Sequence, residues 1–199
     1  MILAYHITQL YNKHIKQTMG IKKMATVTLY HTSYQPITKI EKDSITHRFD
    51  DVLFFAYQPY TPNVGTQHLY EVEVDESELV TVYNLSDDPI AIKEIKDEME
   101  FGFDTPITDD QAFDILTSKH DKTSIECVAD VHYDGDIDMA RSLIDFEKRA
   151  DFYWTLQRIQ AQTAKRDGFW GAISEDEQGE VVMIPMFEKE HLLTYKGEW

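Results

Sequence analysis

Three short segments, far apart along the chain, carry the residue types best suited to chemistry. His31 and Ser33 follow a run of β-forming residues, segment 53–56 (Leu-Phe-Phe-Ala) sets two aromatic rings beside a small residue, and segment 175–179 (Glu-Asp-Glu-Gln-Gly) is an acidic turn. An imidazole can hold a sugar hydroxyl, an aromatic face can stack on a flat cation, and a carboxylate can stabilise a developing positive charge. These groups fit the breaking of a glycosidic bond, because that reaction builds positive charge on the sugar carbon.

Short strands must position the first two segments. Residues 25–30 are rich in β-branched side chains and alternate in character, which predicts a strand that places His31 at its end. Residues 51–56 have a continuous apolar centre and are expected to form a second strand. Further strands are expected over residues 68–74 and 79–83.

Residues 86–150 are predicted to form an inserted helical region. Asp88 followed by Pro89 is typical of a helix cap and its first turn. Thr108 with Gln111 three residues later fits a capping box. Two helices are therefore expected to begin at these positions.

Two more helices and a closing hairpin are expected in the last third of the chain. One helix should begin near Asp138 and bury Leu143 and Ile144. A longer one should be capped by Asp151. The last predicted elements are two strands, over residues 169–174 and 180–186, joined by the acidic turn.

Composition limits where such a site can operate. The chain has 199 residues, enough for one domain with a real core, and 36 acidic against 19 basic side chains give a formal charge of −17. This charge opposes binding to nucleic acid and favours a basic protein surface as partner. The single cysteine, Cys127, excludes an internal disulfide and a cysteine-rich zinc site, which fits a reducing cytoplasm. The histidines are too scattered to predict a metal site, and no apolar run is long enough to span a membrane.

Residues 1–23 differ from the rest of the chain. They contain four lysines and no acidic residue, and their apolar residues recur at helical spacing. The pattern fits a short docking helix or a dispensable leader ahead of a second start at Met24, and we favour the leader. Deleting residues 1–23 should then leave a single folded domain over residues 24–199.

The order of the motifs resembles that of a phage-encoded family of anti-CRISPR proteins with an ADP-ribosyltransferase fold. The resemblance rests on Leu-Tyr-His-Thr-Ser over residues 29–33, segment 53–56, Trp-Thr-Leu-Gln-Arg over residues 154–158, and the acidic turn 175–179. It covers roughly residues 28–51 and 154–185.

This resemblance implies an α+β fold with an ADP-ribosyltransferase-like split β-sheet, the inserted helical region, and an NAD cleft between two small sheets. It also implies an enzyme, a mono-ADP-ribosyltransferase that transfers ADP-ribose from NAD to a side chain of a host protein. In the resembling family the target belongs to a type I CRISPR surveillance complex. We expect such a protein to act as a monomer in the host cytoplasm, with no metal, no membrane and no direct contact with nucleic acid.

The resemblance to histidine-type transferases assigns NAD-binding roles to the first two segments. His31 would hydrogen-bond a ribose hydroxyl, the backbone of Thr32 would hold the nicotinamide amide, and Ser33 would support the same pocket. The aromatic wall against the nicotinamide would come from Phe54, Phe55 or Tyr57.

The same resemblance assigns the catalytic acid to the closing turn. Asp176 aligns with the family's acid, and Glu177 and Glu175 are neighbours able to replace or tune it. His31, Asp176 and Glu177 are thus the expected catalytic residues.

Two other functions stay open. A non-enzymatic acidic inhibitor would mimic DNA and occupy a basic groove through its charge, with no need for NAD. An NAD-binding module without turnover is the other, because Thr32 stands where the family has glycine and would crowd the approach of NAD to the backbone. The residues also have structural interpretations: His31 as a hydrogen-bonded structural histidine, Phe54 and Phe55 as core, and the acidic turn as a solvated loop.

Overall fold

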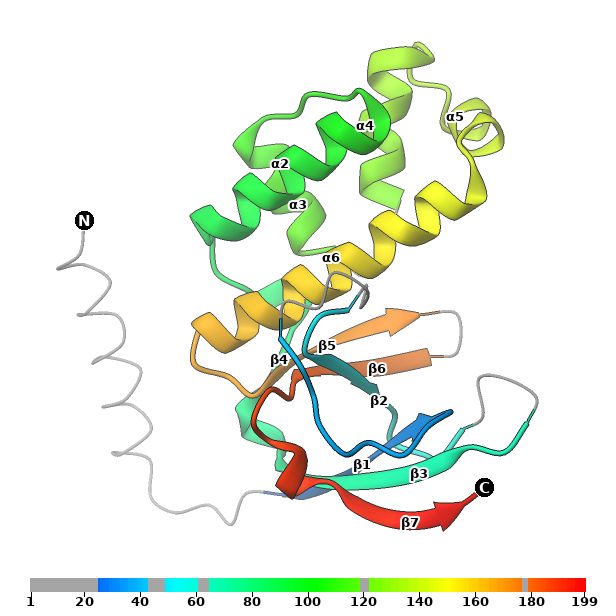
Figure 1. Cartoon of the computed structure of the whole chain (residues 1–199). Coiled ribbons are helices and arrows are strands. Elements are labelled where there is room, and N and C mark those ends of the chain that lie inside the picture. The colour runs from blue at the N-terminus through cyan, green and yellow to red at the C-terminus, as the bar shows by residue number, and fades with distance from the viewer. Residues whose placement is uncertain (1–24, 43–48, 61–64, 119–121, 177–178) are drawn as a thin grey trace, which may run out of the picture.

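Two small β-sheets and five α-helices make up the described part of the chain (Figure 1). This computed structural model describes residues 25–42, 49–60, 65–118, 122–176 and 179–199. The expected α+β class is confirmed. The predicted leader, residues 1–23, lies outside the described residues, so its dispensability stays a prediction.

The first sheet has three antiparallel strands. They are β1 (Thr26–Ser33), β3 (His68–Asp75) and β7 (Thr194–Glu198), in the order β1-β3-β7. The alternation expected for the first two is confirmed, since the buried Leu29 and Val72 face each other across β1 and β3. The sequence did not predict β7, because its side chains are mostly exposed and show no apolar alternation.

The second sheet has four strands in the order β2-β6-β5-β4. They are β2 (Val52–Phe55), β4 (Leu79–Thr81), β5 (Gly171–Asp176) and β6 (Gly179–Pro185). The β4–β5 pair is parallel and the other two pairs are antiparallel. All four strands lie within two residues of the predicted bounds, which confirms these predictions.

One pair of residues joins the two sheets. The N–H of Tyr30 on β1 donates to the carbonyl of Ala56 at 2.8 Å, and the N–H of Ala56 donates back at 2.9 Å. Beside this junction the sheets share a buried apolar cluster that holds them face to face, which includes Leu29, Phe55, Val72, Val74, Val182 and Ile184.

The helices cover the other face of the second sheet. They are α2 (Pro89–Phe103), α3 (Asp109–Leu116), α4 (Lys122–His132), α5 (Ile137–Leu143) and α6 (Phe146–Arg166). Figure 1 shows α6 lying across the second sheet, with α2 to α5 gathered on its far side. The predicted cap at Asp88 and the capping box of Thr108 and Gln111 are both present.

The predicted start of the last helix is wrong. α6 begins at Phe146, and the carboxylate of Asp145 caps it by accepting a hydrogen bond from the N–H of Glu147 at 2.7 Å. Asp151 lies inside the helix. Both aspartates stand before apolar residues at helical spacing, so the local pattern does not choose between them.

The predicted burial of Leu143 is also wrong. Leu143 is 59% exposed, because the short helix α5 turns Ala140 inward against Ile125 and Ala129 of α4. The sequence did not predict α4, whose apolar residues are interrupted by acidic ones.

Gly171 begins β5 at a place with no room for a side chain, and this generates a stability prediction. A Cβ there would clash with the backbone oxygen of Met183 and would lie 2.9 Å from Cγ1 of Ile184. We expect Gly171→Ala to lower the free energy of unfolding by about 1–3 kcal/mol, measured by urea denaturation. The matched control is Gly102→Ala in α2, where a Cβ meets nothing within 4 Å and alanine should stabilise the helix by up to about 1 kcal/mol. Equal effects of the two substitutions would contradict this account of β5.

Candidate functional site

The candidate site lies where the two sheets part, between the ends of β1 and β2. Tyr30 and Ala56 exchange both backbone hydrogen bonds. A continued antiparallel ladder would next place Thr32 opposite Phe54. Instead, the carbonyl of Phe54 accepts a hydrogen bond from Nδ1 of His31 at 2.8 Å. The imidazole N–H therefore occupies the carbonyl that the N–H of Thr32 would bond in a continued ladder.

This substitution leaves backbone groups of Thr32 without a strand partner. Alternate residues of an antiparallel strand direct their N–H and C=O groups to opposite edges. The N–H and C=O of Tyr30 point to Ala56 and away from β3. Thr32 is two residues further on, so its N–H and C=O point away from β3 as well, to the edge of β1 that faces β2. Within the described ranges, no backbone group bonds to Thr32 at that edge. This is the edge that the resemblance assigns to the nicotinamide amide, and that assignment stays a prediction.

The ring of His31 is held in one orientation, and burial favours its neutral form. Its ring centroid lies 5.6 Å from that of Phe55, and the rings are inclined by 52°. Burial lowers the pKa of His31 below its ordinary value of 6.5, and the hydrogen bond to the Phe54 carbonyl opposes this by raising it. Because a carbonyl only accepts, the neutral ring carries its proton on Nδ1. In that neutral form Nε2 is a hydrogen-bond acceptor.

Cross-strand register places two glutamates on the same face of the second sheet as Phe55. Phe55 is opposite Val182 of β6, and Val182 is opposite Ile173 of β5. Side chains two residues along each strand share that face, so Glu180 and Glu175, which are opposite each other, lie one step of about 7 Å further on. Glu175 and Glu180 thus belong to the face that carries the Phe55 ring.

Tyr57 follows β2 and packs against the apolar cluster that contains Phe55. Burial raises the pKa of its phenol above 10.0, and the negative charges of Glu180 and Glu76 raise it further. The carboxylate of Glu180 therefore acts electrostatically on the Tyr57 phenol. Sequence reasoning missed Glu180, although a hairpin closed at residues 176–179 predicts that 175 and 180 pair.

The structure separates the two phenylalanines of the predicted aromatic wall. Phe55 belongs to the cluster between the sheets, whereas Phe54 packs against the core beneath the helices. The Phe54 ring makes an edge contact with Phe49 at 4.8 Å, and Phe49 contacts Trp154 of α6 in the same way at 5.9 Å. The described contacts therefore bring Phe55 and Tyr57 to the site, together with the backbone of Phe54 but not its ring.

The remaining predicted residues lie at strand ends. Ser33 ends β1, and its hydroxyl accepts a hydrogen bond from the N–H of Gln35 at 3.4 Å. Asp176 ends β5 opposite Gly179, but its side chain and the whole of Glu177 lie outside the described residues. The assignment of the catalytic acid stays a prediction.

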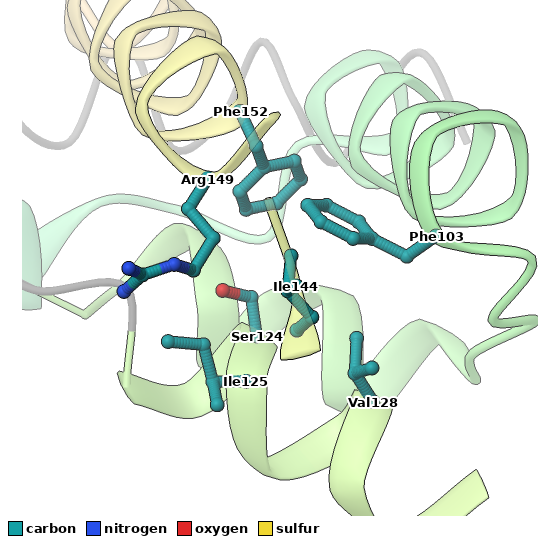
Figure 2. Close-up of a pocket in the computed structure, with 7 residues that line it drawn as sticks. All are labelled: Phe103, Ser124, Ile125, Val128, Ile144, Arg149 and Phe152. Carbon is teal, nitrogen blue, oxygen red and sulfur yellow. The ribbon is translucent and has the colours of Figure 1, made fainter. Parts of the chain in front are cut away.

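A small pocket lies away from this site, among the helices (Figure 2). It is lined by Phe103, Ser124, Ile125, Val128, Ile144, Arg149 and Phe152. Its volume of about 10 Å³ holds about one water molecule, so it is too small for a nucleotide.

Among the residues that the structure describes, no three histidine, cysteine or carboxylate side chains are placed to hold a metal ion. No helix in the described ranges has the length and apolar character to cross a membrane.

Comparison with known proteins finds structural similarity but no matching family. No protein-family model matches the chain, and no curated protein matches it. The chain is structurally similar to a protein whose coordinates are described as the crystal structure of an anti-CRISPR protein. The two are 20% identical, the match covers 89% of this chain and 98% of that chain, and the TM-score is 0.45. A similarity of this size establishes neither a common fold nor a common activity.

The lowered pKa of His31 predicts a pH dependence of stability. Below pH 6.5 the unfolded chain binds a proton on this ring at pH values where the folded chain does not. We expect the free energy of unfolding to be unaffected by His31 above that pH and to fall as the pH drops below it. Urea denaturation between about pH 5 and pH 8 measures this, and His31→Gln should remove that part of the slope. Thr32→Val, which leaves the imidazole in place, should keep the wild-type slope, and an unchanged slope in His31→Gln would contradict the burial of this ring.

Proposed function

We propose that the chain is a mono-ADP-ribosyltransferase that binds NAD where β1 and β2 part. The observation that supports this best is the hydrogen bond from His31 to the Phe54 carbonyl. It fixes the imidazole beside the Phe55 ring and leaves the backbone edge of Thr32 open. A sugar acceptor, an amide-binding edge and an aromatic face are the three contacts that a nicotinamide riboside needs.

Each group has a distinct role in binding. Nε2 of His31 would accept a hydrogen bond from a ribose hydroxyl, and the N–H and C=O of Thr32 would pair with the carboxamide of nicotinamide. Phe55 and Tyr57 would offer aromatic surface to the cationic ring. A neutral His31 suits this role better than a protonated one, because an imidazolium would repel the nicotinamide cation.

The chemistry then requires a carboxylate near the sugar carbon. NAD supplies an ADP-ribose group whose bond to nicotinamide is weakened by the positive charge of that ring. A carboxylate of the closing hairpin would stabilise the positive charge on the ribose carbon as nicotinamide leaves with the electron pair of the broken bond. The acceptor side chain then forms the new bond with its own lone pair and releases its proton to a carboxylate or to water. Asp176 and Glu177 are proposed for this role from the sequence resemblance, and Glu175 and Glu180 from the register of β5 and β6.

The proposed target is a host protein, and a subunit of a type I CRISPR surveillance complex is the specific candidate. This part of the proposal comes from the order of motifs in the sequence. We also propose that the protein acts as a monomer in the host cytoplasm and that it needs no metal.

A second function is favoured by the distribution of charge. Residues 86–150 hold 18 acidic against 7 basic side chains, a net charge of −11 out of −17 for the chain. Such a region could occupy a basic groove as a non-enzymatic mimic of DNA. That function predicts tight, salt-sensitive binding to a purified partner without NAD and with no effect of changes at His31.

NAD binding without any transfer would instead favour the third candidate, an NAD-binding module that has lost turnover.

NAD binding is the first test of the proposed site. At an NAD concentration of about 100 times its Kd, we expect the full chain to gain about 2.7 kcal/mol in free energy of unfolding, seen as a higher Tm. His31→Ala should lose most of this gain. The matched control is Thr32→Val, which keeps the backbone and the side-chain shape and removes a buried hydroxyl oxygen that has no hydrogen-bond partner in the described ranges. NAD binding that survives His31→Ala unchanged would place the nucleotide elsewhere.

Transfer is the second test, with labelled NAD and either host lysate or a purified surveillance complex. We expect label on a host protein, and a loss of about 100-fold or more when the catalytic carboxylate is neutralised. The variants Asp176→Asn, Glu177→Gln, Glu175→Gln and Glu180→Gln distinguish the candidates. Full activity of Asp176→Asn would remove Asp176 as the acid, and full activity of all four would overturn the mechanism.

A further inference from the structure

An exposed apolar surface lies on α5 and the first turn of α6. Met139, Leu143 and Phe146 are 50%, 59% and 70% exposed. Met139 and Leu143 are one helical turn apart and share a face of α5. Phe146 follows three residues later, within about 10 Å of Leu143. We call these three residues the docking surface, and Figure 1 shows α5 at the end of the helical region, far from the first sheet.

The fold itself does not need these side chains. α5 buries Ala140 completely and packs Ile137 and Ile144 against α4. Met139 and Leu143 are left on its outer side. Neighbouring apolar side chains that a chain leaves exposed mark a place where another molecule binds.

The surroundings of the docking surface define the charge of that molecule. Acidic residues flank it on both sides, all of them exposed: Asp134, Asp136, Asp138, Asp145 and Glu147. Arg141 lies among them, and Lys148 and Arg149 follow Glu147, with the guanidinium of Arg149 5.6 Å from the centroid of the Phe146 ring. The surroundings are therefore acidic in balance, with five acidic against three basic side chains over residues 134–149. A second copy of the chain would bring like charges together, and nucleic acid would be repelled in the same way. A basic partner with its own apolar residues is complementary in both respects.

We propose that the docking surface binds a basic, amphipathic segment of the acceptor protein. Its use in presenting the acceptor rests on the proposed transferase activity, but the binding itself does not. The apolar side chains supply affinity when the partner covers them, and the acidic rim accelerates association and selects a positively charged partner. This division separates recognition of the protein from binding of NAD, which belongs to the sheets.

A synthetic helical peptide of leucine and lysine with one apolar face is the probe, and its Kd for the full chain is measured by fluorescence anisotropy without NAD. We expect the combined variant Met139→Ser, Leu143→Ser, Phe146→Ser to bind about tenfold more weakly. The matched control is Ile90→Ser, Phe101→Ser on α2, where the side chains are 61% and 94% exposed, and its Kd should stay within about twofold of wild type. Asp138→Asn, Glu147→Gln should weaken binding and reduce its dependence on salt.

Several outcomes would overturn the proposal. They are no binding of the peptide, equal loss in the α2 control, or self-association of the wild type that the combined variant abolishes. Thermal unfolding with and without NAD checks that the combined variant is folded and still binds nucleotide. If NAD fails to bind even the wild type, the proposed activity fails while the peptide measurement still decides the docking surface. If NAD binds and peptide affinity is unchanged in the combined variant, the docking proposal alone fails.

Discussion

The hydrogen bond between Nδ1 of His31 and the carbonyl of Phe54 is the interaction on which the site depends. That carbonyl faces β1, so either the N–H of Thr32 or the imidazole can take it. If Thr32 took it, β1 and β2 would pair further and the two sheets would become one. Because the imidazole takes it, the junction ends at Tyr30 and Ala56. The seated imidazole and the open backbone edge of Thr32 therefore belong to one arrangement, which the apolar cluster between the sheets holds in place.

α6 fixes the second sheet relative to this junction. Near its first half, the hydroxyl of Tyr153 donates to the carbonyl of Glu175 at 2.7 Å, which holds the hairpin end of β5. Near its last turns, Gln162 donates to the fully buried carboxylate of Asp51, and Nζ of Lys165 lies 3.8 Å from the same carboxylate. One helix thus contacts the sheet at both ends of its strands. Glu175 and Glu180 are positioned by these contacts and by strand register together.

The parts of the fold that could be predicted from the sequence are those with local causes. Strands with alternating or continuous apolar residues and the capping box at Thr108 lie where they were expected, because pattern and capping act within a few residues. The sequence predicts that Phe54 and Phe55 point to opposite faces of a strand. It does not predict which ring meets the helices, because that depends on strands far along the chain. The exposure of Leu143 and the existence of α4 depend on helix packing, which no local window contains. For the candidate site, the sequence identified His31 and the hairpin, while the Phe54 carbonyl and Glu180 required the register.

Glu175 and Glu180 are directly opposed on neighbouring strands at the hairpin end of the second sheet. Directly opposed like charges on neighbouring strands destabilise a sheet by an amount of up to about 1 kcal/mol. Proteins keep such violations of local rules mainly at functional positions. In the proposed function, the cationic nicotinamide, or the charge that develops on the ribose carbon as it leaves, would bring a charge of opposite sign to this face of the sheet.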